Sequence, residues 1–174
     1  YEPEERQVEH EFTQFEPISE IDIKKLVMNS KSTTCPSDPI PTPLIKENID
    51  ILLPLITKIV NLSLNTGSFS EEWKTAFVLP LLKKVGLELI KKNYRPVSNL
   101  SFLSKICEKS ALVQFRDYLT IHNLLPDYLS AYRENYCTET ALIKLHHDIL
   151  MNMEQKKTTV MVMIDLSAAF DKIG

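Results

Sequence analysis

The most informative segment of the sequence is Val160-Met161-Val162-Met163-Ile164-Asp165, which continues as Leu166-Ser167-Ala168-Ala169-Phe170-Asp171. It opens with a run of apolar residues rich in β-branched types, a pattern typical of a strand that is buried on both faces. An ionised carboxylate directly after such a strand is costly unless a cation or hydrogen-bond donors compensate it. Because ligands and metals bind at the carboxyl ends of strands in α/β folds, Asp165 is the first candidate site residue.

Two other interpretations of Asp165 are open at this point. Taken alone, a carboxylate after a core strand is more often an N-cap or turn residue than a ligand. A hydrophobic strand ending in aspartate is also typical of aspartyl-nucleophile phosphatases. That class expects a second acid two residues later, where this chain has Ser167, so the pattern favours it less.

Length and composition are those of an ordinary globular protein. The chain has 174 residues, of which 44% are hydrophobic and 25% charged, so it suits one domain or a piece of a larger one. The longest apolar run, residues 51–56, contains Pro54 and is far shorter than a membrane span, so no membrane contact is expected. The chain begins with Tyr1 rather than Met, which suggests a fragment or a processed boundary.

Cysteine, histidine and glycine each argue against a class of site. The three cysteines are odd in number and widely scattered, which disfavours a disulfide framework. The four histidines show no metal-ligand spacing to one another or to the cysteines, so a zinc site is not expected, and His146 and His147 should be surface residues. None of the three glycines stands in a phosphate-binding glycine motif, which excludes glycine-loop nucleotide binding.

The net charge of −3 by itself argues against nucleic-acid binding, but the distribution of the charges along the chain is more informative. Acidic residues crowd the first 22 positions, whereas basic residues crowd positions 83–109. An acidic head with a basic centre permits a local phosphate-binding surface, although a solvated lysine-rich loop would have the same composition. The basic residues are Lys83, Lys84, Lys91, Lys92, Arg95, Lys105 and Lys109.

The pattern along the chain predicts an α+β fold that is mostly helical with short strands. Ser19-x-x-Asp22 indicates a helix start, Thr42-Pro43 starts a long apolar helix that Gly67 ends, and Pro54 should kink or split that helix. Further helices are expected over 102–121, capped by Ser101, and from a cap at Thr138 to about residue 157. Strands are expected over 75–82, 94–98 and 160–164, with Pro80 marking an edge or a bulge. Residues 29–43, 83–93 and 124–136 should be irregular.

Four motifs in this order resemble the reverse transcriptases of non-LTR, LINE-type, jockey-like retrotransposons. They are SFSEEWKTAFVLPLLKK at 68–84, NYRPVSNLSFLSKICEK at 93–109, SAYRENYCTETAL at 130–142 and VMVMIDLSAAFDKI at 160–173. The proline-rich stretch at 34–41 is also similar to that family. The resemblance covers most of the chain from about Phe15 onward.

The resemblance implies a role for each of seven residues. Asp165 matches the first catalytic aspartate of polymerase motif A and would bind Mg²⁺, with the backbone carbonyl of Leu166 as an accessory ligand. Lys83, Arg95 and Phe170 match residues that meet the incoming deoxynucleotide, Phe170 by excluding a ribose 2′-hydroxyl; between Lys83 and Lys84 the choice is open. Tyr132 and Arg133 match a turn that touches the template, although Tyr132 could equally be a core residue. Nucleotide addition of this type uses two Mg²⁺ ions about 3.5–4 Å apart.

The resemblance further implies an acidic linker at 1–17, an N-terminal helical extension at 18–66, fingers at 67–157, and the first palm strand with its turn at 158–174. The family's Asp-Asp hairpin, the rest of its palm and its thumb are not in the sequence, so the expected protein is a fragment of an RNA-directed DNA polymerase that is inactive alone. Its partners would be RNA template, DNA primer and deoxynucleotide. An unpaired palm strand would also favour self-association. The alternative is a non-catalytic module, derived from the fingers, that binds nucleic acid or protein.

Overall fold

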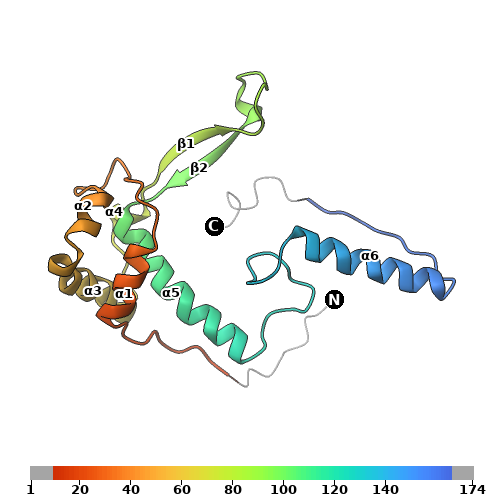
Figure 1. The fold of residues 1–174 in the computed structure, drawn as a ribbon, viewed down its shortest axis with the longest axis horizontal. Helices are drawn as coiled ribbons and strands as arrows, with labels where there is room; N and C mark the ends of the chain where they lie inside the picture. Colours follow the sequence, from red (N-terminus) through yellow and green to blue (C-terminus); the bar gives the residue numbers. More distant parts are fainter. Residues whose placement is uncertain (1–9, 166–174) are drawn as a thin grey trace. The chain divides into compact units, whose positions relative to one another are not determined.

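The computed structural model describes residues 10–165, and the described chain is α+β. It contains the helices α1 (Glu20–Met28), α2 (Thr42–Glu47), α3 (Ile49–Thr66), α4 (Glu71–Lys74), α5 (Phe102–Ile121) and α6 (Thr138–Glu154), the short 3₁₀ helix η1 (Lys91–Asn93), and the strands β1 (Phe77–Leu82) and β2 (Tyr94–Asn99). The chain divides into two compact units, with the boundary between Leu124 and Leu125 (Figure 1).

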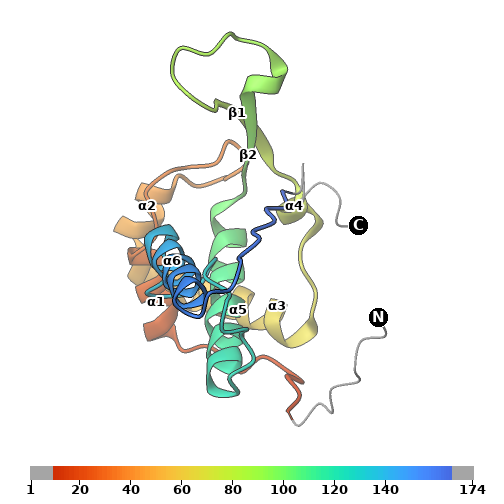
Figure 2. The ribbon, with the colours of Figure 1, turned by 90° about the vertical axis from the view of Figure 1, so that its right-hand side faces the viewer.

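The first unit has a small helical core. Helices α1, α3 and α5 pack together, and α2 packs on α3. The core side chains all come from these four helices and are Ile23, Val27, Ile45, Ile49, Leu53, Ile56, Val60, Phe102 and Ile106. Figure 2 shows the β1–β2 hairpin projecting from this helical base, beyond α4.

Local sequence signals explain where α1 and α5 begin. Ser19 is the N-cap of α1, and its hydroxyl accepts a hydrogen bond from the backbone N–H of Asp22. Ser101 caps α5 in the same way through the N–H of Ser104. Each cap satisfies a backbone donor that has no partner inside the helix, which is why serine is favoured there. Both predicted helix starts are confirmed.

The long apolar helix is split, but not at Pro54. The break falls at Asn48, whose side-chain amide donates to the carbonyl of Leu44 at 2.9 Å and so closes α2. Pro54 lies inside α3 on an exposed face. A proline leaves the carbonyl four residues earlier without its donor, and on an exposed face water can replace it. The prediction that Pro54 splits the helix is therefore wrong, while its alternative, a kink at Pro54, stays a prediction. The predicted end at Gly67 is confirmed by its left-handed φ of 63°.

Helix α3 is long and apolar enough to cross a membrane, judged by length and composition only. The apolar run at 51–56 is thus only a part of a longer apolar helix, Ile49–Thr66. In the first unit its residues Ile49, Leu53, Ile56 and Val60 are buried in the helical core. A core helix of a folded domain has the same composition as a membrane span.

The hairpin is a two-stranded antiparallel sheet in which Pro80 lies opposite Pro96. Lys83 N donates to Asn93 O at 2.8 Å, which makes that pair hydrogen-bonded. Hydrogen-bonded and non-hydrogen-bonded pairs alternate along an antiparallel ladder, so Pro80 and Pro96 form a non-hydrogen-bonded pair. Neither proline costs the ladder a bond, and each removes a donor from an outer edge of the hairpin. The predicted edge position of Pro80 is confirmed.

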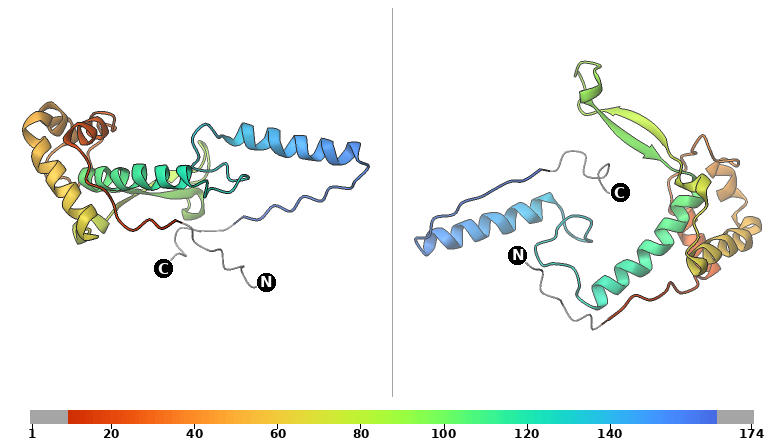
Figure 3. Two further views of the ribbon diagram at one scale, coloured as in Figure 1. Left: turned by 90° about the horizontal axis from the view of Figure 1, so that it is seen from below. Right: turned by 180° about the vertical axis from the view of Figure 1, so that it is seen from behind.

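The second unit consists of an irregular segment, α6 and the chain that follows it. The predicted α6 is present, but its N-cap is Cys137 rather than Thr138. The helix ends at Glu154 with Gln155 as its C-cap, and the next residue, Lys156, has a left-handed φ of 57°. Lys156 N donates to Met153 O and Lys157 N donates to Asn152 O, the two bonds of a Schellman ending. The two views of Figure 3 show the chain turning at this end of α6 and running back along the helix direction.

Candidate nucleic-acid and nucleotide interface

The ladder of the hairpin places Arg95 and Lys83 on one face. Leu81 pairs with Arg95, and the hydrogen bond from Lys83 to Asn93 continues the ladder one residue past β1. Side chains of alternate residues share a face, so Leu81, Lys83 and Arg95 do so. Diagonal neighbours across such a ladder are about 7–8 Å apart, which one phosphate group or two adjacent ones can bridge. Lys84 lies beyond the last ladder bond, in a bend.

The connection between the two strands is basic and exposed. Lys83 Nζ donates to the carbonyl of Lys92 at 2.7 Å, which holds the start of the connection to its end. Asn93 Nδ2 donates to Glu88 O at 2.8 Å within the same loop. Lys84, Lys91 and Lys92 are exposed. The tip of the hairpin therefore carries several exposed positive charges. Hydrogen bonds within the loop hold its backbone in place.

The base of the hairpin is fixed to the helical core through the proline-rich segment. The Asp38 carboxylate accepts from Cys35 N at 2.8 Å and from Phe102 N, the first residue of α5, at 2.7 Å. An acidic group at a helix N-terminus is favourable because the helix dipole is positive there. Cys35 Sγ reaches Asn99 O, at the end of β2, at 3.3 Å. These contacts join residues 35–38 to both β2 and α5.

The turn that contains Tyr132 and Arg133 lies in the second unit. Tyr132 has a left-handed φ of 59° and is 91% exposed, so it is not a core residue in the described chain. The Arg133 guanidinium lies over the ring of Tyr136, 4.4 Å from its centroid. A second contact joins Arg133 Nη1 to Pro126 O at 3.4 Å. An exposed aromatic ring beside a held cation suits contact with a base and its phosphate.

Residues 160–164 do not form the buried strand that the sequence predicts. They belong to no sheet of the described chain, and their side chains are exposed, Ile164 to 84%. A strand of this type needs neighbours on both edges and covers on both faces, and the described residues supply neither. Asp165 is exposed at the end of this segment. Leu166 and Phe170 lie outside the described residues.

Within residues 10–165, no cluster of three or more His, Cys, Asp or Glu side chains is placed to hold a metal ion. The donor chemistry of Asp165 suits Mg²⁺, which prefers oxygen ligands and takes one or two carboxylates in such sites. One exposed carboxylate is not a complete donor set. The described residues therefore contain no formed metal centre, and the role of Asp165 as a metal ligand stays a prediction.

Sequence reasoning overlooked two features. The segment predicted as an acidic linker is held in place over residues 10–18, because Gln114 and Asn61 hydrogen-bond to its backbone. Such contacts leave no trace in the composition of the linker. Cys137 is an exposed thiol at a helix start, and hydrogen bonds from Thr140 and from the backbone of Glu139 lower its pKa. The sequence signal for this thiol was a cysteine directly before a helix start that contains two threonines.

Comparison with known proteins gives relatives of one kind. The chain is 32% identical over 115 residues to the probable RNA-directed DNA polymerase from transposon BS of Drosophila melanogaster, a match that covers 66% of this chain and 13% of the relative. It is 27% identical over 124 residues to the RNA-directed DNA polymerase from mobile element jockey of the same species, over 71% of this chain and 14% of the relative. The jockey polymerase of Drosophila funebris matches at 25% over 159 residues, 91% of this chain and 17% of the relative.

No protein-family model and no solved structure matches the chain. The curated matches confirm the resemblance to reverse transcriptases of jockey-like, non-LTR transposable elements, and the chain is related to these polymerases in sequence. It spans only about 13–17% of the length of these relatives.

Proposed function

We propose that the chain forms the fingers of an RNA-directed DNA polymerase from a non-LTR retrotransposon, together with the aspartate that begins its catalytic site. The matches to jockey-type polymerases support this proposal. The observation that carries it is the shared face of Lys83 and Arg95 on the β1–β2 hairpin, because those residues would have to act on one group. The α+β architecture is compatible with part of such a polymerase.

Arg95 and Lys83 would bind the triphosphate of an incoming deoxynucleotide. A guanidinium grips phosphate oxygens with two parallel bonds, and an ammonium adds a mobile point charge. Pro96 follows Arg95 and favours an extended backbone there, which aims the side chain away from the ladder. The ladder favours Lys83 over Lys84 for this role, because Lys84 is outside the register that Arg95 shares.

The remaining site residues would act around this nucleotide. Tyr132 and Arg133 would contact the RNA template, and Phe170 would exclude a 2′-hydroxyl group, the feature that distinguishes RNA from DNA. Asp165 and the Leu166 carbonyl would hold Mg²⁺, which when bound would stabilise charge on the transferring phosphate. On this proposal residues 18–66 are an N-terminal helical extension, 67–157 the fingers, and 158–174 the first palm segment. Further acidic residues would have to join Asp165 for catalysis.

The binding part of the proposal is tested with the 174-residue chain and a labelled RNA–DNA hybrid in a fluorescence anisotropy titration at several salt concentrations. Non-specific phosphate binding typically has a Kd of about 10⁻⁴–10⁻⁶ M and weakens steeply with salt. The Lys83→Ala/Arg95→Ala double variant should bind more weakly and lower the salt slope by about two. Lys84→Ala/Lys109→Ala removes the same charge elsewhere and should change binding less. Equal effects of the two double variants would contradict a specific role for the shared face.

The catalytic part is tested by primer extension. The 174 residues alone should add no deoxynucleotide to a primer, because Asp165 is a single carboxylate. In a polypeptide that joins these residues to the rest of a jockey-type polymerase, Asp165→Asn should abolish extension while hybrid binding by the fingers persists. If Asp165→Asn extends primers normally, the chain is better explained as a non-catalytic module that binds nucleic acid.

A further inference from the structure

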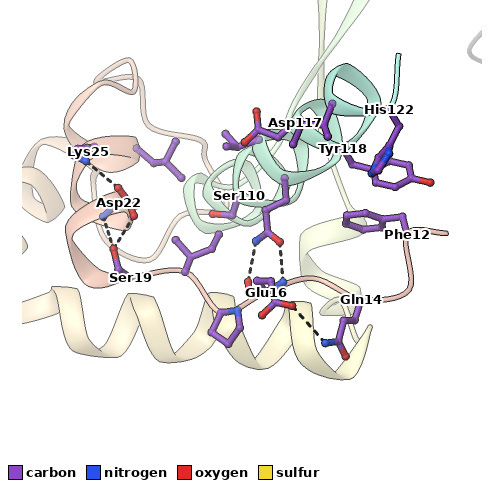
Figure 4. Close-up of a pocket in the computed structure, with 16 residues that line it drawn as sticks. Phe12, Gln14, Glu16, Ser19, Asp22, Lys25, Ser110, Asp117, Tyr118 and His122 are labelled. Atoms are coloured by element: carbon purple, nitrogen blue, oxygen red, sulfur yellow. Dashed lines mark hydrogen bonds and ion pairs between the residues drawn. The ribbon is translucent and has the colours of Figure 1, made fainter. Parts of the chain in front are cut away.

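The first unit contains a cavity of about 690 Å³ that the proposed function does not use. It lies between residues 12–19, which we call the strap, and the helices α1 and α5 (Figure 4). Cavities that bind small organic molecules measure about 300–1,000 Å³ and combine apolar walls with a few polar groups. Here the apolar wall includes Phe12, Leu26, Val113 and Ile121.

The walls of the cavity are fixed without any ligand. Gln114 on α5 accepts from the N–H of Glu16 and donates to its carbonyl, both at 2.8 Å. Asn61 on α3 makes the same pair of bonds to Ile18, at 2.8 and 3.0 Å. Tyr118 Oη donates to His10 O at 2.7 Å, just before the strap. A site whose walls are already ordered loses little conformational entropy on binding.

The α5 wall of the cavity has an unused hydrogen-bonding group. Ser110 is fully buried, and its hydroxyl has no hydrogen-bond partner in the described chain. Ser110 lines the cavity from α5, as Figure 4 shows. A buried hydroxyl without a partner is unfavourable, and a ligand that supplies one recovers that loss.

The lining of the cavity is acidic as a whole. With histidine counted as neutral, its charged lining residues are Glu16, Asp22 and Asp117 against Lys25 alone. Lys25 is already engaged, since its Nζ lies 2.9 Å from Asp22. No cation of the described residues forms an ion pair with Asp117. Asp117 follows Ser110 by seven residues on α5, which is about two turns and roughly 10 Å along the same face.

We propose that this cavity binds an organic cation with an apolar or aromatic body, whose ammonium group pairs with Asp117 and whose far end carries a hydroxyl or carbonyl group that hydrogen-bonds to Ser110. The length between the two groups selects molecules with a charge and a polar atom at opposite ends. The negative lining selects against carboxylates. This site is separate from the hairpin and does not depend on the proposed polymerase function.

Tyramine is a suitable probe, because its phenol and its ammonium stand at opposite ends of a short aromatic body. Amide chemical shifts of the full 174-residue chain are followed by NMR during titration with tyramine, phenethylamine and para-hydroxyphenylacetate. Tyramine should shift strap and α5 amides and bind about fivefold more tightly than phenethylamine, which lacks the hydroxyl. Para-hydroxyphenylacetate, which has the phenol but the opposite charge, should not bind.

Two variants and a control separate the two ends of the site. Asp117→Asn should weaken tyramine and phenethylamine alike by about fivefold or more, since both carry the ammonium. Ser110→Ala should abolish the advantage of tyramine over phenethylamine and leave the fold intact, because it removes a hydroxyl that has no partner. Asp148→Asn on α6 removes the same charge from a residue that is not part of the cavity lining and should change neither affinity. Equal binding of the anionic probe, no shifts with tyramine, or equal effects of Asp117→Asn and Asp148→Asn would each overturn the proposal.

Discussion

Helices α5 and α6 have similar amphipathic sequences and different surroundings. In α5 the first two turns bury Phe102, Ile106 and Cys107 against the other helices of the first unit. In α6, whose predicted apolar face is Leu142, Leu145, Ile149 and Met153, no described residue is buried. Leu142 is 62% exposed, whereas Ile106 is fully buried. Apolar periodicity therefore predicts a helix and its apolar face, whereas the burial of that face depends on which other elements are present to cover it.

The largest expected effect comes from truncating the buried face. Ile106→Ala should lower the free energy of unfolding of the first unit by about 2–5 kcal/mol, because it removes apolar contacts and leaves a cavity. Leu145→Ala on α6 should change stability by no more than about 0.5 kcal/mol. Urea unfolding followed by the fluorescence of Trp73, the single tryptophan, measures the first unit directly. Similar losses in the two variants would contradict the difference in burial between α5 and α6.

A second comparison concerns the two amides that hold the strap. Asn61→Ala should cost about 1–3 kcal/mol, because it leaves the partly buried N–H and C=O of Ile18 without partners. Gln114→Ala should cost less, since the bonds to Glu16 are exposed and water can replace them. The same urea experiment gives both values. Amide hydrogen exchange at Ile18 and Glu16 checks that each variant releases its own residue.

Thiol chemistry sharpens the contrast between the two units. Cys137 should react with iodoacetamide at least about tenfold faster than Cys35 or Cys107, because it is exposed and its thiolate is favoured by a lowered pKa. Mass spectrometry of peptides taken during labelling measures the three rates. Thr140→Val should slow Cys137 modestly, because it removes the Thr140 hydroxyl, the second contribution to that lowered pKa, and keeps the largest one, the backbone N–H of residue 140. Unchanged labelling in Thr140→Val would contradict the contribution of the hydroxyl.

Local signals allowed most of the fold to be predicted from the sequence. Ser19, Ser101 and Gly67 act through bonds to residues within a few positions, so they are readable without tertiary structure. The break at Asn48 was not predicted, because a proline on an exposed face can remain inside a helix and an asparagine can close one. Residues 160–164 have the composition of a core strand, but strand formation depends on partners that no local pattern supplies.

The candidate site was predictable in part for the same reason. The two strands and the basic connection between them were predicted from composition and local patterns, although their pairing was not, and the resemblance to reverse transcriptases named Lys83 and Arg95. Their shared face follows from the register, which only the ladder bonds fix. The cavity under the strap was not predictable, because it depends on side chains far apart in sequence, such as Phe12 and Ser110.

A smaller effect is expected at the ends of α5 and α6. Both helices end in a left-handed residue, Asn123 after α5 and Lys156 after α6. Lysine adopts this conformation with strain and asparagine with little, whereas glycine adopts it freely. Lys156→Gly should therefore stabilise α6 by roughly 0.5–1 kcal/mol, and Asn123→Gly should change α5 much less. Far-ultraviolet circular dichroism during thermal unfolding measures both; a larger gain at Asn123 would contradict the argument.

The smallest effect is the pH dependence at the start of α1. The hydrogen bond from Lys25, with a second one from Ser19, lowers the pKa of Asp22 below its usual 3.8. A carboxyl group with a lowered pKa in the folded state contributes stability that is present above the unfolded pKa and is lost as the pH falls through the folded pKa. The side chain is exposed, so the contribution is small. Urea midpoints measured from about pH 5 to pH 3 should fall less steeply in Asp22→Asn than in the parent chain, and Lys25→Ala should fall between them because it removes the largest cause of the shift. If Asp22→Asn shows the same acid dependence as the parent, the loss of stability in acid arises at other carboxylates, and the bond between α1 residues 22 and 25 contributes nothing measurable to the first unit.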